Sequence, residues 1–396
     1  MIVVLFILVI FLLKKKLSLL DDRVRNNIMI IIFGGIFIII LFNLYVEYYV
    51  GWKYGVPFDD DSRWIFKASE AINKGEKWDR LYRLVSRDWD ITNRSLSISN
   101  FGQYLYATII SYCLYHPVLF DLHINIYLVY LTQLMLISVS VIDVIIEIDG
   151  LYKKSYKKLP SLTVVFFMLL FYPMVIFNAG KMIREAIYIF AMLEVFACFI
   201  NYIALGKLNK FFIIYSFLFV LIRPMSIIIV IPLSLWIIFG DIIAISSNIV
   251  IMAIFIVGTV IINKVMSIIG WSYSLGEVSI SELIHLFMFP NILNQFSDFL
   301  MMFSHPSWQT IVYFFQSFWN IPFIFLMVIG ILNPKDKKLS FLLFTIFINS
   351  MSVYSISYSI GNFTPRYKLT YFIPQVYFVY IGLCTIKNKI RIRKAY

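Results

Sequence analysis

Long apolar runs follow one another along almost the whole chain, and they limit its possible folds more than any other feature. Several of these runs approach or exceed the ~20 residues that an α-helix needs to cross a bilayer. Charged residues make up only 14% of the chain and hydrophobic residues 61%, whereas soluble domains carry roughly 25% charged residues. The sequence therefore predicts an all-helical, polytopic integral membrane protein.

Short basic clusters separate the apolar runs and predict the topology. Lys and Arg concentrate in cytoplasmic loops of membrane proteins, so we place all five clusters in the cytoplasm. This choice gives about eleven crossings, with the N-terminus outside and the C-terminus inside. It also accounts for the net charge of +12 without a nucleic-acid partner. The clusters are 14–16 with Arg23 and Arg25, 153–158, Lys207 with Lys210, 335–338 and 387–394.

The apolar runs between these clusters are the predicted crossings. Segments 101–117 and 282–303 are also apolar, but we interpret both as helices at the outer interface. Counting 101–117 as a crossing would place residues 153–158 outside. No internal repeat or linker is visible, so we expect one domain over residues 1–396. The predicted crossings are 1–13, 28–50, 122–147, 161–178, 186–205, 211–222, 225–240, 246–268, 308–332, 339–356 and 370–386.

One long polar segment, residues 51–100, lies in the predicted extracytoplasmic loop 51–121 and includes Asp59, Asp60 and Asp61. Adjacent carboxylates raise one another's pKa, which suits one of them to act as a general base near neutral pH. Alternatively, Asp61 or Ser62 only caps a short amphipathic helix that starts near Ile65 and ends at Gly75. Asp59 and Asp61 are also the candidate ligands of a divalent cation, the one cofactor that the sequence suggests.

Five cations fall at predicted outer ends of helices, against the usual bias toward the cytoplasm. Charge close to the apolar region is costly and is usually functional there. A lipid phosphate or pyrophosphate is the natural counter-ion, since Arg can bind it through two hydrogen bonds. The alternative is a local ion pair, either Arg184 with Glu185 or Arg223 with a loop carboxylate. The five cations are Lys181, Arg184, Arg223, Arg366 and Lys368.

Other kinds of site have little support in the sequence. The three cysteines and four histidines show no metal-ligand spacing. Neither a phosphate-binding glycine loop nor a nucleophile elbow is present, so we do not expect nucleotide hydrolysis or serine chemistry.

The order of these features resembles the GT-C type of membrane glycosyltransferase. The matching features are Asp60, Trp64, Ala68 and Gly75 at helical spacing, an apolar helix over 101–115, the break at Arg223-Pro224, and Arg366-Tyr367 before the last helix. The resemblance implies that Asp60, with Asp59 beside it, is the catalytic base. It also implies that Arg366, Arg184 and Arg223 bind a polyprenyl phosphate.

The chain also resembles bacterial surface-polysaccharide polymerases of the Wzy and EpsG types. These proteins have a helix that opens with Arg after an outer turn, here Lys181-Met182-Ile183-Arg184-Glu185, and a late Arg-x-x-Tyr/Phe helix, here 366–371. These resemblances imply sugar transfer from a polyprenyl-linked donor at the outer face of a bacterial inner membrane, in surface polysaccharide synthesis, with repeat-unit polymerisation as the alternative. A flippase or transporter ranks third, because polar residues crowd at one face. The expected partners are the polyprenyl-linked sugar, membrane lipid and other polysaccharide-assembly proteins.

Overall fold

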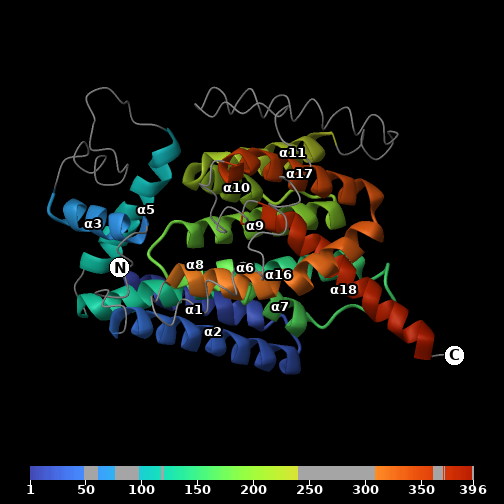
Figure 1. Ribbon diagram of the computed structural model, residues 1–396, viewed down its shortest axis with the longest axis horizontal. Coiled ribbons are helices and arrows are strands. Elements are labelled where there is room, and N and C mark those ends of the chain that lie inside the picture. The colour runs from blue at the N-terminus through green and yellow to red at the C-terminus, as the bar shows by residue number, and fades with distance from the viewer. Residues whose placement is uncertain are drawn as a thin grey trace. The chain divides into compact units, whose positions relative to one another are not determined.

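The computed structural model describes residues 1–48, 61–75, 98–116, 120–239, 308–359, 369 and 371–394. All regular structure among these residues is helical, which confirms the predicted all-helical class (Figure 1). The elements are α1 (Ile2–Leu17), α2 (Asp22–Tyr48), α3 (Asp61–Asn73), α5 (Ile98–Tyr115), α6 (Leu122–Tyr152), α7 (Leu162–Leu170), α8 (Pro173–Ala179), α9 (Glu185–Leu205), α10 (Phe211–Ile222), the 3₁₀ turn η2 (Pro224–Ser226), α11 (Ile227–Ile238), α16 (Trp308–Leu332), α17 (Lys337–Ser359) and α18 (Phe372–Lys394).

Several of these helices can cross a bilayer. Four described helices are long and apolar enough, namely α2, α6, α9 and the Ile311–Leu332 part of α16, and the α7–α8 pair is a fifth if it counts as one span. Large exposed apolar side chains, including Phe33, Phe37, Phe217 and Phe325, support contact with lipid. The chain therefore has the character of a multi-pass membrane protein. The count of about eleven crossings stays a prediction, and segments 246–268 and 282–303 lie outside the described residues.

The predicted crossing 161–178 is not one straight helix. It forms α7 and α8, which meet at an angle of 64°. Pro173 is the first residue of α8, and Tyr172 before it has ψ near 118°. Proline has no N–H to continue the preceding helix, and it forces the residue before it out of the helical region. Because the residues on both sides of this break are apolar, hydropathy alone does not reveal it.

The predicted crossing 211–222 has the expected bounds as α10, whereas α11 covers only part of the predicted crossing 225–240. Helices α10 and α11 have 12 residues each. At 1.5 Å per residue, each is about 18 Å long, whereas the hydrocarbon core is about 30 Å thick. Pro224 again follows the end of a helix, and η2 separates the two pieces. Neither piece spans a bilayer alone.

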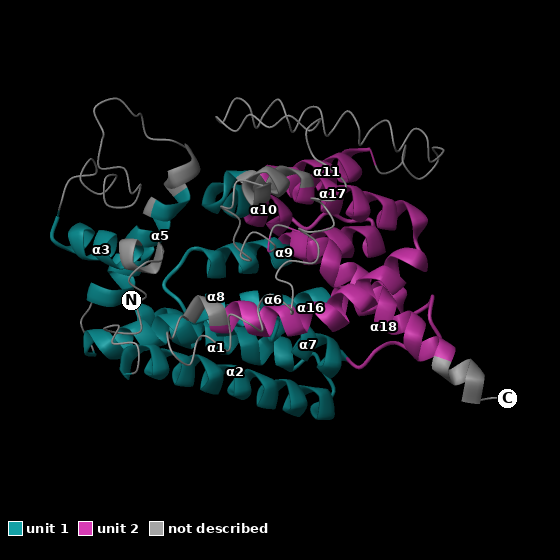
Figure 2. Cartoon of the chain, in the orientation of Figure 1, with its two compact units in different colours: residues 1–145, 162–194, 217–224 teal, residues 146–161, 195–216, 225–396 magenta. Residues whose placement is uncertain are grey.

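The chain forms two compact units (Figure 2). Unit 1 consists of residues 1–145, 162–194 and 217–224, and unit 2 consists of residues 146–161, 195–216 and 225–396. Helices α6, α9 and α10 contribute residues to both units. The candidate site described below lies in unit 1.

Contacts within unit 1 agree with the predicted alternation of helix ends. The Met1 amino group donates to the His116 carbonyl at 2.5 Å. The two ends predicted to lie outside, at Glu47 and His123, are joined by an Oε2–Nε2 contact of 3.0 Å. Near the predicted inner ends, Lys16 Nζ lies 2.7 Å from Asp143 Oδ1. Each contact joins two points that the topology places on the same side; which side faces outward stays a prediction.

Three basic clusters predicted to be cytoplasmic come together within unit 2. Asn388 Nδ2 donates to the Lys158 carbonyl at 2.9 Å, and Lys387 Nζ donates to the Leu159 carbonyl at 2.6 Å. Lys335 Nζ lies 5.0 Å from the centre of the Tyr156 ring. Their common location supports the assignment of all three clusters to one side.

Candidate functional site

The centre of the candidate site is the turn that joins α8 to α9. Asn43 on α2 donates from Nδ2 to the carbonyls of Ile39, at 2.8 Å, and Gly180, at 3.2 Å. A side chain at Gly180 would bring its Cβ within 3.2 Å of Ile39. The absence of a side chain therefore allows this turn to lie close against α2.

Gln133 on α6 holds the same turn from another direction. In the amide orientation that satisfies both of its ends, its nitrogen donates to the carbonyls of Ala179 and Lys181, at 2.9 Å each. Its oxygen accepts a hydrogen bond from the Tyr106 hydroxyl on α5. Burial raises the pKa of Tyr106 well above its usual range, so this phenol stays a donor. Helices α2, α5 and α6 thus fix the backbone that carries Lys181.

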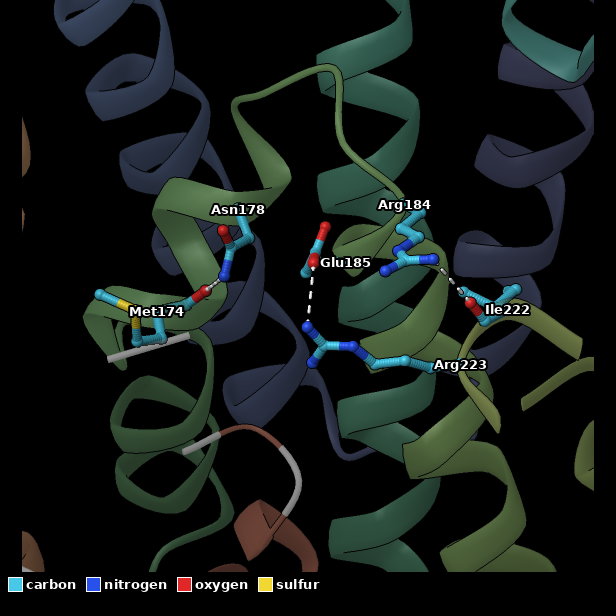
Figure 3. Close-up of polar contacts among 6 residues, drawn as sticks. All are labelled: Met174, Asn178, Arg184, Glu185, Ile222 and Arg223. Atoms are coloured by element: carbon cyan, nitrogen blue, oxygen red, sulfur yellow. Dashed lines mark hydrogen bonds and ion pairs between the residues drawn. The ribbon is translucent and has the colours of Figure 1, made fainter. Parts of the chain in front are cut away.

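The start of α9 contacts the end of α10 through two arginines (Figure 3). Arg223 Nη2 lies 3.5 Å from Glu185 Oε1, and the two residues are 7% and 1% exposed. Arg184 Nη1 donates to the Ile222 carbonyl at 3.3 Å. The last carbonyls of a helix have no intrahelical donor, so the end of α10 offers an acceptor to this guanidinium.

An aromatic ring adds a second contact to Arg223. Its Cζ lies 5.4 Å from the centre of the Tyr188 ring, which is one turn beyond Glu185 on α9. Tyr188 in turn packs against Phe219 of α10, with ring centres 4.8 Å apart. The carboxylate and the negative ring face both stabilise the buried guanidinium.

We name Lys181, Arg184, Glu185 and Arg223 the cation cluster. Its members carry three positive charges and one negative charge, and Lys181 is only 5% exposed. Glu185 Oε2 has no hydrogen-bond partner among the described residues. Of the sequence-predicted cations, Arg184 and Arg223 therefore occur together where the end of α10 contacts the start of α9, and Lys181 lies in the turn just before α9.

The expected local ion pair exists, but its partners differ from those predicted. Glu185 pairs with Arg223, which is 38 positions away, and not with Arg184, its neighbour in sequence. Adjacent residues on a helix point in different directions, whereas the break after α10 brings Arg223 to the start of α9. Sequence analysis also missed Gln133 and Tyr106; a glutamine inside the apolar run 122–147 was the available signal.

Helix α5, from the predicted outer loop, contacts the end of α10. The backbone at Gly102 is so close to the Ile222 carbonyl that a Cβ at Gly102 would overlap it. Helix α3 packs on α5 (Figure 1). The predicted extracytoplasmic loop 51–121 thus supplies two helices to unit 1, one of them at the Arg184 acceptor.

Helix α3 confirms the predicted amphipathic helix in this loop. Ile65 and Ala68 are buried, together with Ala71. The helix starts at Asp61, earlier than the predicted Ile65, and Gly75 follows its end with φ of 71°. A positive φ favours glycine, as expected for a helix terminus.

The remaining predicted site residues lie outside the described structure. Asp59, Asp60, Arg366 and Lys368 fall in undescribed segments, as does the side chain of Asp61. The catalytic base, the cap at Asp61 and the divalent cation therefore stay predictions. Within the described part of the chain, no group of three His, Cys, Asp or Glu side chains has the arrangement of a metal site.

Comparison with known proteins gives no match to a family model, to a curated protein or to a solved structure. The chemistry of the site therefore has to be argued from its own residues.

Proposed function

We propose that this protein transfers sugar from a polyprenyl-phosphate-linked donor at the outer face of a bacterial inner membrane, during synthesis of a surface polysaccharide. The observation that carries the proposal is the cation cluster, in which Arg223 pairs with Glu185 and Arg184 donates to the Ile222 carbonyl beside it, with the buried Lys181 three positions before Arg184. Charge in such surroundings is costly, so membrane proteins keep it chiefly where it serves a function.

The cluster suits an anionic leaving group. When the sugar is transferred, the bond from its anomeric carbon to the lipid phosphate breaks, and the phosphate keeps the electron pair. Arg184 and Arg223 would donate hydrogen bonds to the phosphate oxygens as negative charge develops on them. Interactions between charges are stronger away from bulk water, which increases the benefit of burial. The α9 N-terminus adds a favourable dipole for an anion.

The second half of the reaction needs a base for the acceptor hydroxyl. Asp60, with Asp59 beside it, is the proposed base because these residues precede α3 in the predicted outer loop. Arg366 and Lys368 would complete the phosphate site, and Asp59 with Asp61 would hold a divalent cation if the reaction uses one.

Polymerisation of lipid-linked repeat units is the second candidate. It is favoured by one specific observation, the position of Arg184 and Glu185 at the opening of α9 after the 180–184 turn. This alternative uses the arginines and does not require Asp60. Transport of a lipid-linked oligosaccharide is the third candidate, in which the same cations would bind the phosphate without transfer.

The test is the surface-glycan length ladder of cells that carry each variant, with the membrane level of the protein measured in parallel. Arg184→Gln and Asp60→Asn abolish the product if the transfer proposal is right. Lys210→Gln is the control, because this cation is exposed at the far end of α10. Loss of long chains with single repeat units retained would identify a polymerase. A normal ladder for Arg184→Gln would contradict both enzyme proposals.

A further inference from the structure

A second site lies in unit 1, between the hairpin of α1 and α2 and the neighbouring α6. There the helices form a partly open cavity of about 580 Å³, a volume within the roughly 300–1,000 Å³ of small-molecule pockets. Most of its lining is apolar, and its polar members are Lys14, Ser18 and Arg25. The lining residues are Ile10, Leu13, Lys14, Leu17, Ser18, Arg25, Met29, Ile32, Phe33, Ile36 and Met135.

The helical twist of α1 distributes its three consecutive lysines in different directions. Lys16 pairs with Asp143 at 2.7 Å, whereas Lys14 lines the cavity. Lys14 and Lys15 are both exposed, but only Lys14 is part of the lining. Successive residues are about 100° apart around a helix, which explains this division. Lys14, which lines the cavity, and Lys15, which does not, are therefore adjacent in sequence and can be compared by substitution.

Arg25 contributes a second cation to the cavity. Its Nη2 lies 2.6 Å from Asp22 Oδ1, and the Asp22 side chain is 84% exposed. A guanidinium has five N–H donors, so this exposed pair does not use its full capacity. Ser18 Oγ donates to the Lys15 carbonyl at 2.7 Å. The polar part of the cavity is thus dominated by two cations from the loop end of the hairpin.

We propose that this cavity binds an anionic glycerophospholipid of the surrounding membrane. Its phosphate would accept hydrogen bonds from Lys14 and Arg25, and an acyl chain would lie against Ile10, Met29 and Ile36. Charge complementarity supports this occupant, because Lys14 has no acidic partner among the described residues and Arg25, although paired with Asp22, keeps further N–H donors. Basic pockets at the cytoplasmic ends of membrane helices suit anionic headgroups, and the topology predicts that end for this hairpin.

The adjoining surface supports the same occupant. Ile10 and Phe33 line the cavity and are 39% and 68% exposed. These apolar side chains give an acyl chain a continuous path from the cavity to the bilayer. A soluble inorganic anion has no apolar part that would contact such a rim.

The experiment measures lipid retained by the purified full chain in neutral detergent, by native mass spectrometry. The probes are phosphatidylglycerol and phosphatidylcholine with identical acyl chains. The variant Lys14→Gln/Arg25→Gln is compared with Lys15→Gln/Arg23→Gln, which removes the same charge from the same hairpin outside the cavity lining. We expect the cavity variant to weaken phosphatidylglycerol binding about 30-fold, or about fivefold per cation, which corresponds to about 1 kcal/mol each. The control variant keeps wild-type binding.

A second variant tests the cavity without changing charge. Ile36→Trp adds volume to the apolar part and should abolish phosphatidylglycerol retention while Lys14 and Arg25 remain. Equal retention of both lipids, equal losses in the two charge variants, or normal binding by Ile36→Trp would each overturn the proposal. Preferential retention of an added polyprenyl phosphate that depends on Lys14 would also overturn it. The readout is binding alone, so the result is independent of the proposed sugar transfer.

Discussion

Arg223 and Glu185 form a buried ion pair, with 3.5 Å between Nη2 and Oε1, that joins the end of α10 to the start of α9. Removal of one partner from a buried pair leaves an uncompensated charge and costs about 3–5 kcal/mol. We therefore expect Arg223→Gln and Glu185→Gln each to lower the thermal midpoint of the detergent-solubilised protein. The double variant should lose less stability than the sum of the single losses.

Lys210→Gln serves as the control for these single and double variants, because the Lys210 side chain is exposed at the other end of α10. Additive losses in the double variant would show that the two side chains do not interact, and the proposed geometry of the cation cluster would then be wrong.

The close approach of Gly102 to the Ile222 carbonyl gives a second prediction. Gly102→Ala places a methyl group where backbone already lies, so α5 has to move away from the end of α10. Overpacking of this kind costs about 1–3 kcal/mol. Gly150→Ala is the matched control, because no atom lies within 4 Å of the added Cβ and alanine favours a helix. Thermal midpoints of the two variants check the prediction, and similar values would contradict the close contact.

The pair between Lys16 and Asp143 gives a third prediction. Asp143 is on α6, and its side chain is only 14% exposed. Lys16→Gln removes its counter-charge, whereas Lys15→Gln removes an exposed charge one position earlier. We expect Lys16→Gln to be destabilising by a few kcal/mol and Lys15→Gln to be nearly neutral. Denaturation of both variants in detergent checks this, and equal stabilities would exclude a stabilising role for the pair.

Helices α16 and α18 of unit 2 provide a fourth prediction. A Cβ at Gly330 would overlap the Phe378 carbonyl, and a Cβ at Gly382 would overlap the Leu326 carbonyl. The two glycines permit the same close antiparallel contact, as small residues commonly do between membrane helices. We expect Gly330→Ala and Gly382→Ala each to lower the thermal midpoint.

Because one substitution already separates these two helices, the double variant should cost less than the sum of the single variants. Full additivity in the measured midpoints would indicate that the two contacts are independent.

Sequence periodicity predicted the features that depend on local chemistry. Residue types at fixed spacing predicted the amphipathic helix α3 and its end at Gly75. They also predicted that helices are interrupted at the basic clusters. Lys181, Arg184 and Arg223 were singled out from the sequence because the predicted topology places them against the usual charge bias; their role stays a prediction.

Features that depend on tertiary packing could not be predicted from the sequence. Nothing local indicates that Glu185 would pair with Arg223, or that Gln133 would hold the 179–181 turn. The bend at Tyr172-Pro173 divides a run that is apolar on both sides, so hydropathy alone predicted one continuous crossing. The position of Pro173 was the sequence signal for this bend.

The most direct test of the central claim is binding of a labelled short-chain polyprenyl phosphate to the purified protein. Arg184→Gln is the best variant, because Arg184 donates to a backbone carbonyl and its removal does not break the Arg223–Glu185 pair. Loss of a hydrogen bond to a charged group costs about 1.5–3 kcal/mol, so the account predicts binding at least about tenfold weaker than wild type. Lys210→Gln should bind normally. Unchanged binding by a folded Arg184→Gln protein would contradict the assignment of the cation cluster to lipid phosphate.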